Sequence, residues 1–318
     1  MRIGIDLGGT NLRAAVIDDG SAISEHHKER VGEPRDPQTI VERCARVCEE
    51  LANSAEATVG VGLAAMLRGR EGMVASSPHL RWRDVPFGQL LAKRLGPRFL
   101  IGLYNDVNAI VFGEATAGAA RGAKDVLGVY VGTGIGGGLI VNGELVEGAS
   151  NTAGEIGHAK VRWDDDAAPC ACGNRGCVEA YVGGSYLKAR IKKEIAAGAK
   201  TSAVRIAGSI EEVHPGHVDQ AAAEGDEWAL GLWTELAPLL GVTLANAVAV
   251  LNPERLVLGG GVLGRCPTLY ALVETTLMVA GNAASMEALS IVPAELGDDA
   301  GIVGAAHLAA RGVSTIRT

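Results

Sequence analysis

An α/β fold is predicted for this chain of 318 residues from two observations. Short apolar runs of β-type residues alternate with longer segments whose apolar residues recur at helical spacing, which is typical of α/β proteins. A strand, a glycine-rich turn and a second strand also occur twice, about 125 residues apart. This repeat suggests two related halves, in agreement with a length sufficient for about two domains.

The first half opens with a strand–turn–strand unit, in which Leu7-Gly8-Gly9-Thr10 joins two apolar runs as a hairpin does. A helix over 36–53 is predicted because its apolar residues share one face: Ile40, Val41, Cys44, Val47, Cys48 and Leu51. The other expected elements are strands at 2–6, 12–17, 59–63 and 99–104 and helices at 86–95 and 107–120. The corner at Asn105-Asp106 is the expected domain boundary.

The second half repeats the unit, with Gly132-Thr133-Gly134 as the turn between strands at 126–131 and 138–141. The later expected elements are strands at 255–258 and 291–294 and helices at 226–251, 269–279 and 302–310. The most apolar stretch, 236–251, is interrupted by polar residues and by Pro238. It is too short to span a bilayer, so we expect a buried helix there.

The composition excludes several classes of protein. Apolar residues make up 47% and charged residues 21% of the chain, which is ordinary for a globular protein and excludes disordered, collagen-like and coiled-coil chains. The net charge of −8 argues against a nucleic-acid binder. The N-terminus has no apolar segment of the signal-peptide type, so we expect a cytoplasmic protein with reduced thiols.

Three glycine clusters end predicted strands, and they include much of the excess among the 44 glycines: Gly8–Gly9, Gly132–Gly138 and Gly259–Gly261. Glycine lets backbone N–H groups approach an anion closely. Thr10 and Thr133 add hydroxyl donors, and the Asp6 carboxylate could hold a hydrated Mg²⁺. One such cluster alone is more simply a tight turn, whereas three with paired threonines indicate a nucleotide site.

Other nucleotide-binding motifs do not fit the chain. A Walker A loop needs a Gly-Lys dipeptide, and protein kinases carry His-Arg-Asp; both are absent from the sequence. Residues 132–137 match the dinucleotide fingerprint G-x-G-x-x-G. That fingerprint must open a helix, whereas residues 138–143 predict a strand and a turn, so we reject NAD binding there.

A metal site is predicted from four residues with the spacing H-x11-C-x-C-x4-C: His158, Cys170, Cys172 and Cys177. Three thiolates and one imidazole form the closed tetrahedral set that holds structural Zn²⁺. Disulfides are the alternative, which a reducing compartment disfavours. Cys44 and Cys48 are predicted to pack in the core, and Cys266 is given no role.

Four polar residues are candidates for binding a ligand with several hydroxyl groups. Glu155 and Glu179 flank the metal segment, which would fix both carboxylates near one another; a solvated surface residue is the alternative for each. Asn105 and Asp106 follow the carboxyl end of a strand, where the sites of α/β proteins lie. Asp106 can also be the N-cap of the next helix, and both roles can hold.

These motifs together resemble the ROK family of sugar kinases, and within it most closely the bacterial glucokinases, from residue 3 to about 308. The motifs that carry the resemblance are Asp6-Leu7-Gly8-Gly9-Thr10-Asn11, Asn105-Asp106-Val107-Asn108-Ala109, Gly132 to Gly138, Gly154-Glu155-Ile156-Gly157-His158, Cys170 to Glu179, Leu258-Gly259-Gly260-Gly261 and Gly297-Asp298-Asp299-Ala300-Gly301.

The resemblance implies an actin-like, ribonuclease-H-type duplicated ATPase fold with a cleft between two lobes. The small lobe would comprise 1–106 and the C-terminal helix at about 302–318, and the large lobe 107–301, with the zinc motif and the adenosine site. ATP with Mg²⁺ would be held by Asp6, Gly8, Gly9, Thr10, Asn11, Gly132, Thr133, Gly134, Gly259, Gly260, Gly261 and Gly301. The sugar would be bound by Asn105, Asp106, Glu155, His158 and Glu179, with Asp106 as the general base.

The implied activity is ATP-dependent phosphorylation of a hexose, with glucose to glucose 6-phosphate as the leading candidate and mannose, fructose or an N-acetylhexosamine as alternatives. Two departures leave the sugar open: Ala65-Met66 where many members carry Pro-Gly, and His79, expected on the sugar side, where they often carry Asn. A sugar-sensing repressor of this family would need a DNA-binding segment before Asp6, so neither nucleic acid nor membrane is an expected partner. A homodimer or homotetramer is implied.

Overall fold

The computed structural model describes residues 1–316. Contacts divide the chain into two compact units, one of 1–126, 138–154 and 294–318 and the other of 127–137 and 155–293. The boundary expected at Asp106 lies one helix before this division. Helix α3 (Asp106–Ala117) belongs to the first unit because it packs against α11 (Ala300–Ala310).

The first unit is built on a six-stranded sheet with the order β14-β8-β4-β1-β2-β3. Its strands are β1 (Arg2–Leu7), β2 (Asn11–Ile17), β3 (Ile23–Arg30), β4 (Ala57–Leu63), β8 (Phe99–Asn105) and β14 (Thr315–Ile316). Strand β4 runs parallel to both β1 and β8, and the register pairs Asp6 with Gly62 and Leu63 with Asn105. The pairing therefore brings Asp6 and Asn105 to the same end of the parallel strands, which is their carboxyl end.

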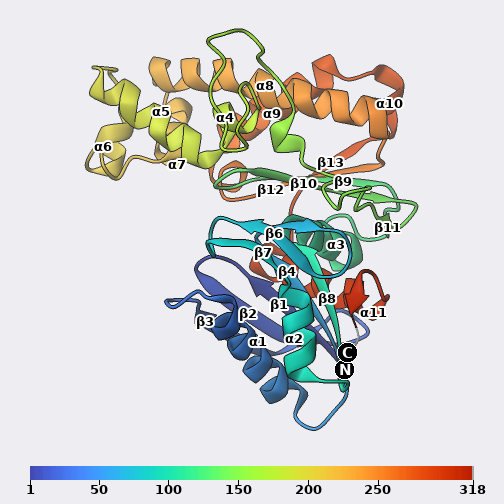
Figure 1. Cartoon of the computed structure of the whole chain (residues 1–318). Helices are drawn as coiled ribbons and strands as arrows, with labels where there is room; N and C mark the ends of the chain where they lie inside the picture. The colour runs from blue at the N-terminus through green and yellow to red at the C-terminus, as the bar shows by residue number, and fades with distance from the viewer. Residues whose placement is uncertain (317–318) are drawn as a thin grey trace. The chain divides into compact units, whose positions relative to one another are not determined.

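Helices cover both faces of this sheet (Figure 1). On one face α1 (Pro37–Ala52) and α2 (Phe87–Leu95) form a core with apolar side chains of the strands, and the predicted apolar face of α1 is buried except for Leu51, which is partly buried. On the other face α11 lies directly on the strands. A Cβ at Gly4 or Gly60 would fall 2.0 Å or 1.8 Å from a backbone oxygen of α11. Part of the glycine excess therefore serves helix-on-sheet packing and not phosphate contacts.

The first unit also contains elements that the sequence did not predict. A separate three-stranded sheet consists of β5 (Met66–Arg68), β6 (Met73–Ser77) and β7 (Trp82–Val85). Its strands are short and only partly buried, so they lack a clear alternation of apolar and polar residues. Strand β3 was also not predicted, because none of its eight residues is fully buried and its exposed residues are mostly charged.

The second sheet has the order β11-β10-β9-β12-β13. Its strands are β9 (Val126–Val131), β10 (Ile135–Val141), β11 (Glu144–Leu145), β12 (Arg255–Gly259) and β13 (Ser290–Pro293), and the division between the units falls within β10. Strand β10 begins at Ile135, three residues earlier than expected. Its glycines adopt extended backbone within the sheet rather than prolonging the turn.

Helices make up most of the second unit: α4 (Glu179–Val182), α5 (Gly184–Ala196), α6 (Ala203–Ala207), α7 (Pro215–Ala223), α8 (Glu227–Leu251), α9 (Pro267–Ala280) and α10 (Ala283–Ala288). In the described part of the chain, α8 alone has the length and hydropathy of a membrane span. It packs along α9, and Trp233, Leu236, Leu240 and Leu244 are buried at helical spacing. Helix α8 is therefore a core helix, as predicted.

Candidate functional site

The turn between β1 and β2 is closed by a hydrogen bond of 3.0 Å from Gly8 N–H to the Asn11 carbonyl. Thr10 is exposed at this turn. Before the turn, the largely buried Asp6 carboxylate accepts a hydrogen bond of 3.0 Å from Arg13, whose other terminal nitrogen lies 2.8 Å from Asp298. Burial raises the pKa of Asp6, and Arg13 opposes that rise. The sequence motifs do not include Arg13, although it pairs directly with Asp6 across the hairpin.

Two further predicted residues lie against this turn region. A Cβ at Gly301, near the start of α11, would lie 3.8 Å from the side chain of Asp6. His79 is exposed and so close to Gly9 that a Cβ on Gly9 would lie 2.6 Å from the His79 Cβ. Gly9 thus leaves room for His79, which sits beside the candidate phosphate turn.

Asn105 and Asp106 form the junction between β8 and α3. The Asn105 side-chain oxygen accepts hydrogen bonds from the N–H groups of Val107 and Asn108, at 2.9 and 3.2 Å. Asn105 is therefore the N-cap, a role that the sequence offered to Asp106, which is instead the first residue of the helix. The Asn105 amide nitrogen also donates to the Ala65 carbonyl at 3.1 Å. These three bonds fix the backbone that carries Asp106.

The turn between β9 and β10 has the same length as the first turn, three residues. Gly132 N–H bonds the Gly134 carbonyl at 2.9 Å. The start of α5 donates to the same turn, from Gly184 to Gly132 and from Ser185 to Thr133, both at 2.9 Å. The start of α5 and a bond within the turn thus hold the turn in shape.

A pocket of about 460 Å³ opens beside this second turn, within the second unit. It is lined by Gly132, Thr133, Gly184, Ser185, Lys188, His214, Pro215, Gly216, Gly261, Val262 and Arg265. These residues, all within the described part of the chain, include two cations and no carboxylate. Gly259 and Gly260 are not among them; Gly260 instead packs against the backbone of Val131, to which a Cβ would come within 2.5 Å.

The basic side chains of the pocket come from segments that contain none of the sequence motifs described above. Lys188 lies on α5, and His214 caps α7, its Nδ1 accepting a hydrogen bond of 3.1 Å from Gly216 N–H. Burial, with His217, Arg265 and Lys188 nearby, lowers the pKa of His214. Arg265 donates from Nε to the Gly261 carbonyl at 2.9 Å. The pocket therefore favours a ligand with negative charge.

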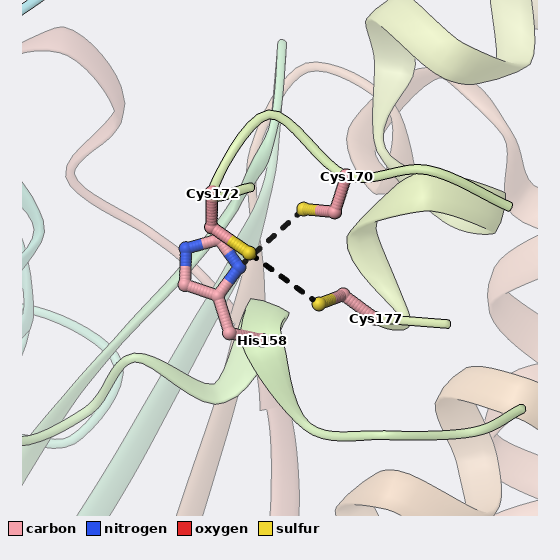
Figure 2. Close-up of side chains that lie close together, drawn as sticks. All are labelled: His158, Cys170, Cys172 and Cys177. Atoms are coloured by element: carbon pink, nitrogen blue, oxygen red, sulfur yellow. Dashed lines mark hydrogen bonds between the residues drawn. The ribbon is translucent and has the colours of Figure 1, made fainter. Parts of the chain in front are cut away.

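The predicted metal ligands point toward one another (Figure 2), and their ligand atoms all lie within 4.8 Å of each other. The Sγ atoms of Cys172 and Cys177 are 3.7 Å apart, and the Sγ of Cys170 is 3.7 Å from Nδ1 of His158. Zn–S bonds of about 2.3 Å and Zn–N bonds of about 2.0 Å in a tetrahedron would give edges of roughly 3.8 and 3.6 Å. The cluster therefore fits a Zn²⁺ ion, with Nδ1 as the histidine ligand.

The remaining ring nitrogen of His158 lies next to a carboxylate. Nε2 is 3.7 Å from Glu155 Oε2, and Glu155 is 39% exposed. Burial and the neighbouring Glu179 raise the pKa of Glu155, and His158 opposes this rise. Nε2 and the two glutamates thus form a polar group at the edge of the metal cluster.

Glu179 connects the cluster to the second turn. Its Oε1 lies 3.9 Å from Sγ of Cys170, and its Oε2 accepts a hydrogen bond of 2.7 Å from Ile135 N–H. Cys44, Cys48 and Cys266 are buried away from this cluster, the first two in the core as predicted.

A model of the ROK family matches residues 2–312. The chain is 31% identical to the glucokinase of Streptomyces coelicolor over 97% of both chains. It is 32% identical to the N-acetyl-D-glucosamine kinase of Pasteurella multocida, over 97% of this chain and 99% of that protein. The crystal structure of a ROK family glucokinase from Streptomyces griseus in complex with glucose and AMPPNP has a TM-score of 0.78 and 29% identity, over 98% of this chain and 99% of that one.

Proposed function

The chain belongs to the ROK family, and on that premise we propose that it is an ATP-dependent hexose kinase whose leading substrate is glucose. Its fold is the two-domain actin-like α/β fold of ROK kinases. The observation that carries the proposal is the polar group at the metal cluster, in which His158, Glu155 and Glu179 present an imidazole nitrogen and two carboxylates.

In this proposal the polar group recognises the sugar. The carboxylates accept hydrogen bonds from hydroxyl groups, and charged acceptors make such bonds stronger than neutral ones. The zinc ion would be held by Nδ1 of His158 and the three thiolates, which fixes the ring so that Nε2 keeps one orientation. With all four positions taken by protein, the metal's role would be structural.

The donor nucleotide is assigned to the pocket beside the second turn. Its cations, Lys188 and Arg265, suit the negative charge of a phosphate chain, and the glycine turn contributes the exposed Thr133 to the lining. Asp6 suits the Mg²⁺ of the nucleotide because hard cations prefer carboxylate and water oxygens. Arg13 occupies only the Oδ2 atom of Asp6.

Asp106 is assigned the role of general base. The hydroxyl oxygen of the sugar forms a bond to the γ-phosphorus, the bond from that phosphorus to the bridging oxygen of ADP breaks, and the hydroxyl proton passes to the Asp106 carboxylate. The hydrogen bonds around Asn105 fix the backbone from which this side chain projects. Positioning and charge neutralisation then provide most of the rate enhancement.

A panel of sugars tests the proposed activity. Purified protein is assayed with MgATP and glucose, mannose, fructose, N-acetylglucosamine or N-acetylmannosamine, and kcat/KM is compared. We expect glucose to rank first. A higher value for another sugar would reject glucose while retaining the kinase. Absence of turnover with every sugar would reject the kinase and favour a sugar-sensing regulator.

The protein is further proposed to act in the cytoplasm as a homodimer or homotetramer. The cytoplasmic assignment is the expectation from the amino-acid sequence, and the oligomeric one comes from the resemblance to ROK kinases. Light scattering during gel filtration measures the molar mass, and a mass equal to that of one chain across the working concentration range would contradict the second assignment.

A further inference from the structure

Lys160 is not one of the four predicted ligands, but it contacts the metal cluster. Its Nζ donates a hydrogen bond of 3.1 Å to Sγ of Cys177 and one of 2.8 Å to the carbonyl of Arg175. Lys160 and Cys177 also form an isolated antiparallel bridge. The sequence motif gave no signal for this contact, because Lys160 is an ordinary exposed lysine two residues after His158.

The backbone around this contact is held on both sides. Val161 N–H bonds the Gly176 carbonyl, and Val178 N–H bonds the Ala159 carbonyl, both at 2.9 Å. The backbones that carry Lys160 and Cys177 are therefore held side by side, which keeps the ammonium group within reach of the Cys177 sulfur.

The net charge of the metal-bound cluster favours a cation beside Cys177. A divalent ion with three thiolates and a neutral imidazole carries a net charge of −1, and Cys177 is fully buried. The carboxylates nearest the ligands, Glu155 and Glu179, add further negative charge. Among the described residues that contact a ligand atom of the cluster, Lys160 supplies the positive charge.

We propose that Lys160 is a positioning residue for the zinc site, which stabilises the Cys177 thiolate and offsets the negative charge of the metal-bound cluster. The inference rests on zinc occupancy of the cluster but not on the identity of the sugar. Loss of a hydrogen-bond partner of a metal ligand typically lowers metal affinity by about 10- to 100-fold. Because Lys160 is exposed, removing its ammonium group should weaken zinc binding by about tenfold, the lower end of that range.

The test compares Lys160→Gln and Lys160→Arg with wild type in zinc affinity, measured by competition with a chromophoric chelator. We expect Lys160→Gln to bind zinc about tenfold more weakly and Lys160→Arg to stay close to wild type, because the charge is kept. Lys193→Gln, a change at an exposed lysine of α5, is the matched control. In the cobalt-substituted protein the thiolate charge-transfer band should shift in Lys160→Gln.

Thermal unfolding distinguishes charge compensation from simple bracing of the loop. If Lys160 only braced the segment, Lys160→Gln would lower the Tm of the metal-free and zinc-loaded proteins equally and leave zinc affinity unchanged, which would overturn the proposal. A wild-type protein that binds no zinc would overturn the proposal as well. The sugar panel reports separately on the proposed kinase activity.

Discussion

Glu179 accepts a hydrogen bond of 2.7 Å from the backbone N–H of Ile135, and so joins the metal segment to the glycine turn of the second sheet. The residue before Ile135 is glycine for a packing reason. A Cβ on Gly134 would lie 2.3 Å from Oε2 of Glu179. The sequence motifs assigned Gly134 to phosphate binding, and the closeness of Glu179, which is a proposed ligand of the sugar, is a second reason for glycine at this position.

Gly134→Ala should therefore disable the enzyme while leaving it folded. The added methyl group displaces the Glu179 carboxylate, and a misplacement of about 1 Å in a reacting group can reduce the rate roughly 100-fold. We expect kcat/KM to fall by about that factor in the coupled assay. The matched control is Gly231→Ala in α8, where a Cβ meets nothing within 4 Å and normal turnover is expected.

Asp106→Asn should abolish most turnover without preventing sugar binding. The amide keeps the shape of the side chain but cannot take the hydroxyl proton, and loss of a general base reduces the rate by roughly 10²–10⁴-fold. We expect kcat to fall within that range while the Kd for sugar, measured by calorimetry, changes little. Near-normal turnover in this variant would falsify the assigned base.

Cys172→Ser should release the metal and, with it, the sugar. Cys172 is the exposed member of the cluster, so the change removes a ligand without opening a cavity in the core. Elemental analysis should give about one zinc per chain in the wild type and much less in the variant. Cys266→Ala, outside the cluster, should keep its zinc. A folded and active protein without metal would contradict the structural role.

Lys188→Met and Arg265→Met should each raise KM for ATP by about tenfold with little change in kcat, because they remove binding that is equal in ground and transition states. The loss should shrink as salt is added, since salt screens the phosphate charges. Lys193→Met on the same helix as Lys188 is the control. An unchanged KM in both variants would place the nucleotide elsewhere.

Acid should destabilise the first unit through His307. Burial lowers the pKa of His307, and its Nε2 lies 2.9 Å from the Ser21 hydroxyl. The folded state therefore binds fewer protons than the unfolded state just below the ordinary histidine pKa of about 6.5, and stability falls as the pH drops through that region. In urea unfolding from pH 7.5 to 5.5, His307→Gln should show a weaker decline. An identical decline would assign the acid sensitivity to other groups.

The sequence predicted the core of the fold because its signals are local. The apolar face of α1, the two strand–turn–strand units and the helix α8 follow from residue spacing alone, and the structure has all of them. The four metal ligands are also a local pattern, close in the chain. The small sheet β5–β7 escaped prediction because its short, half-exposed strands have no clear period.

The sequence by itself determined the family, from motifs spread over residues 3 to about 308, and it determined the glycine turns and the His/Cys cluster, each of which lies within a short segment of chain. Only the tertiary structure decided which residues complete them. Lys188, His214 and Arg265 reach one pocket from three separate segments, and Arg13 bonds both Asp6, which is close to it in sequence, and Asp298, which lies near the other end of the chain. Such contacts depend on strand register and helix packing, which join residues far apart in sequence and leave no periodic signal in the chain.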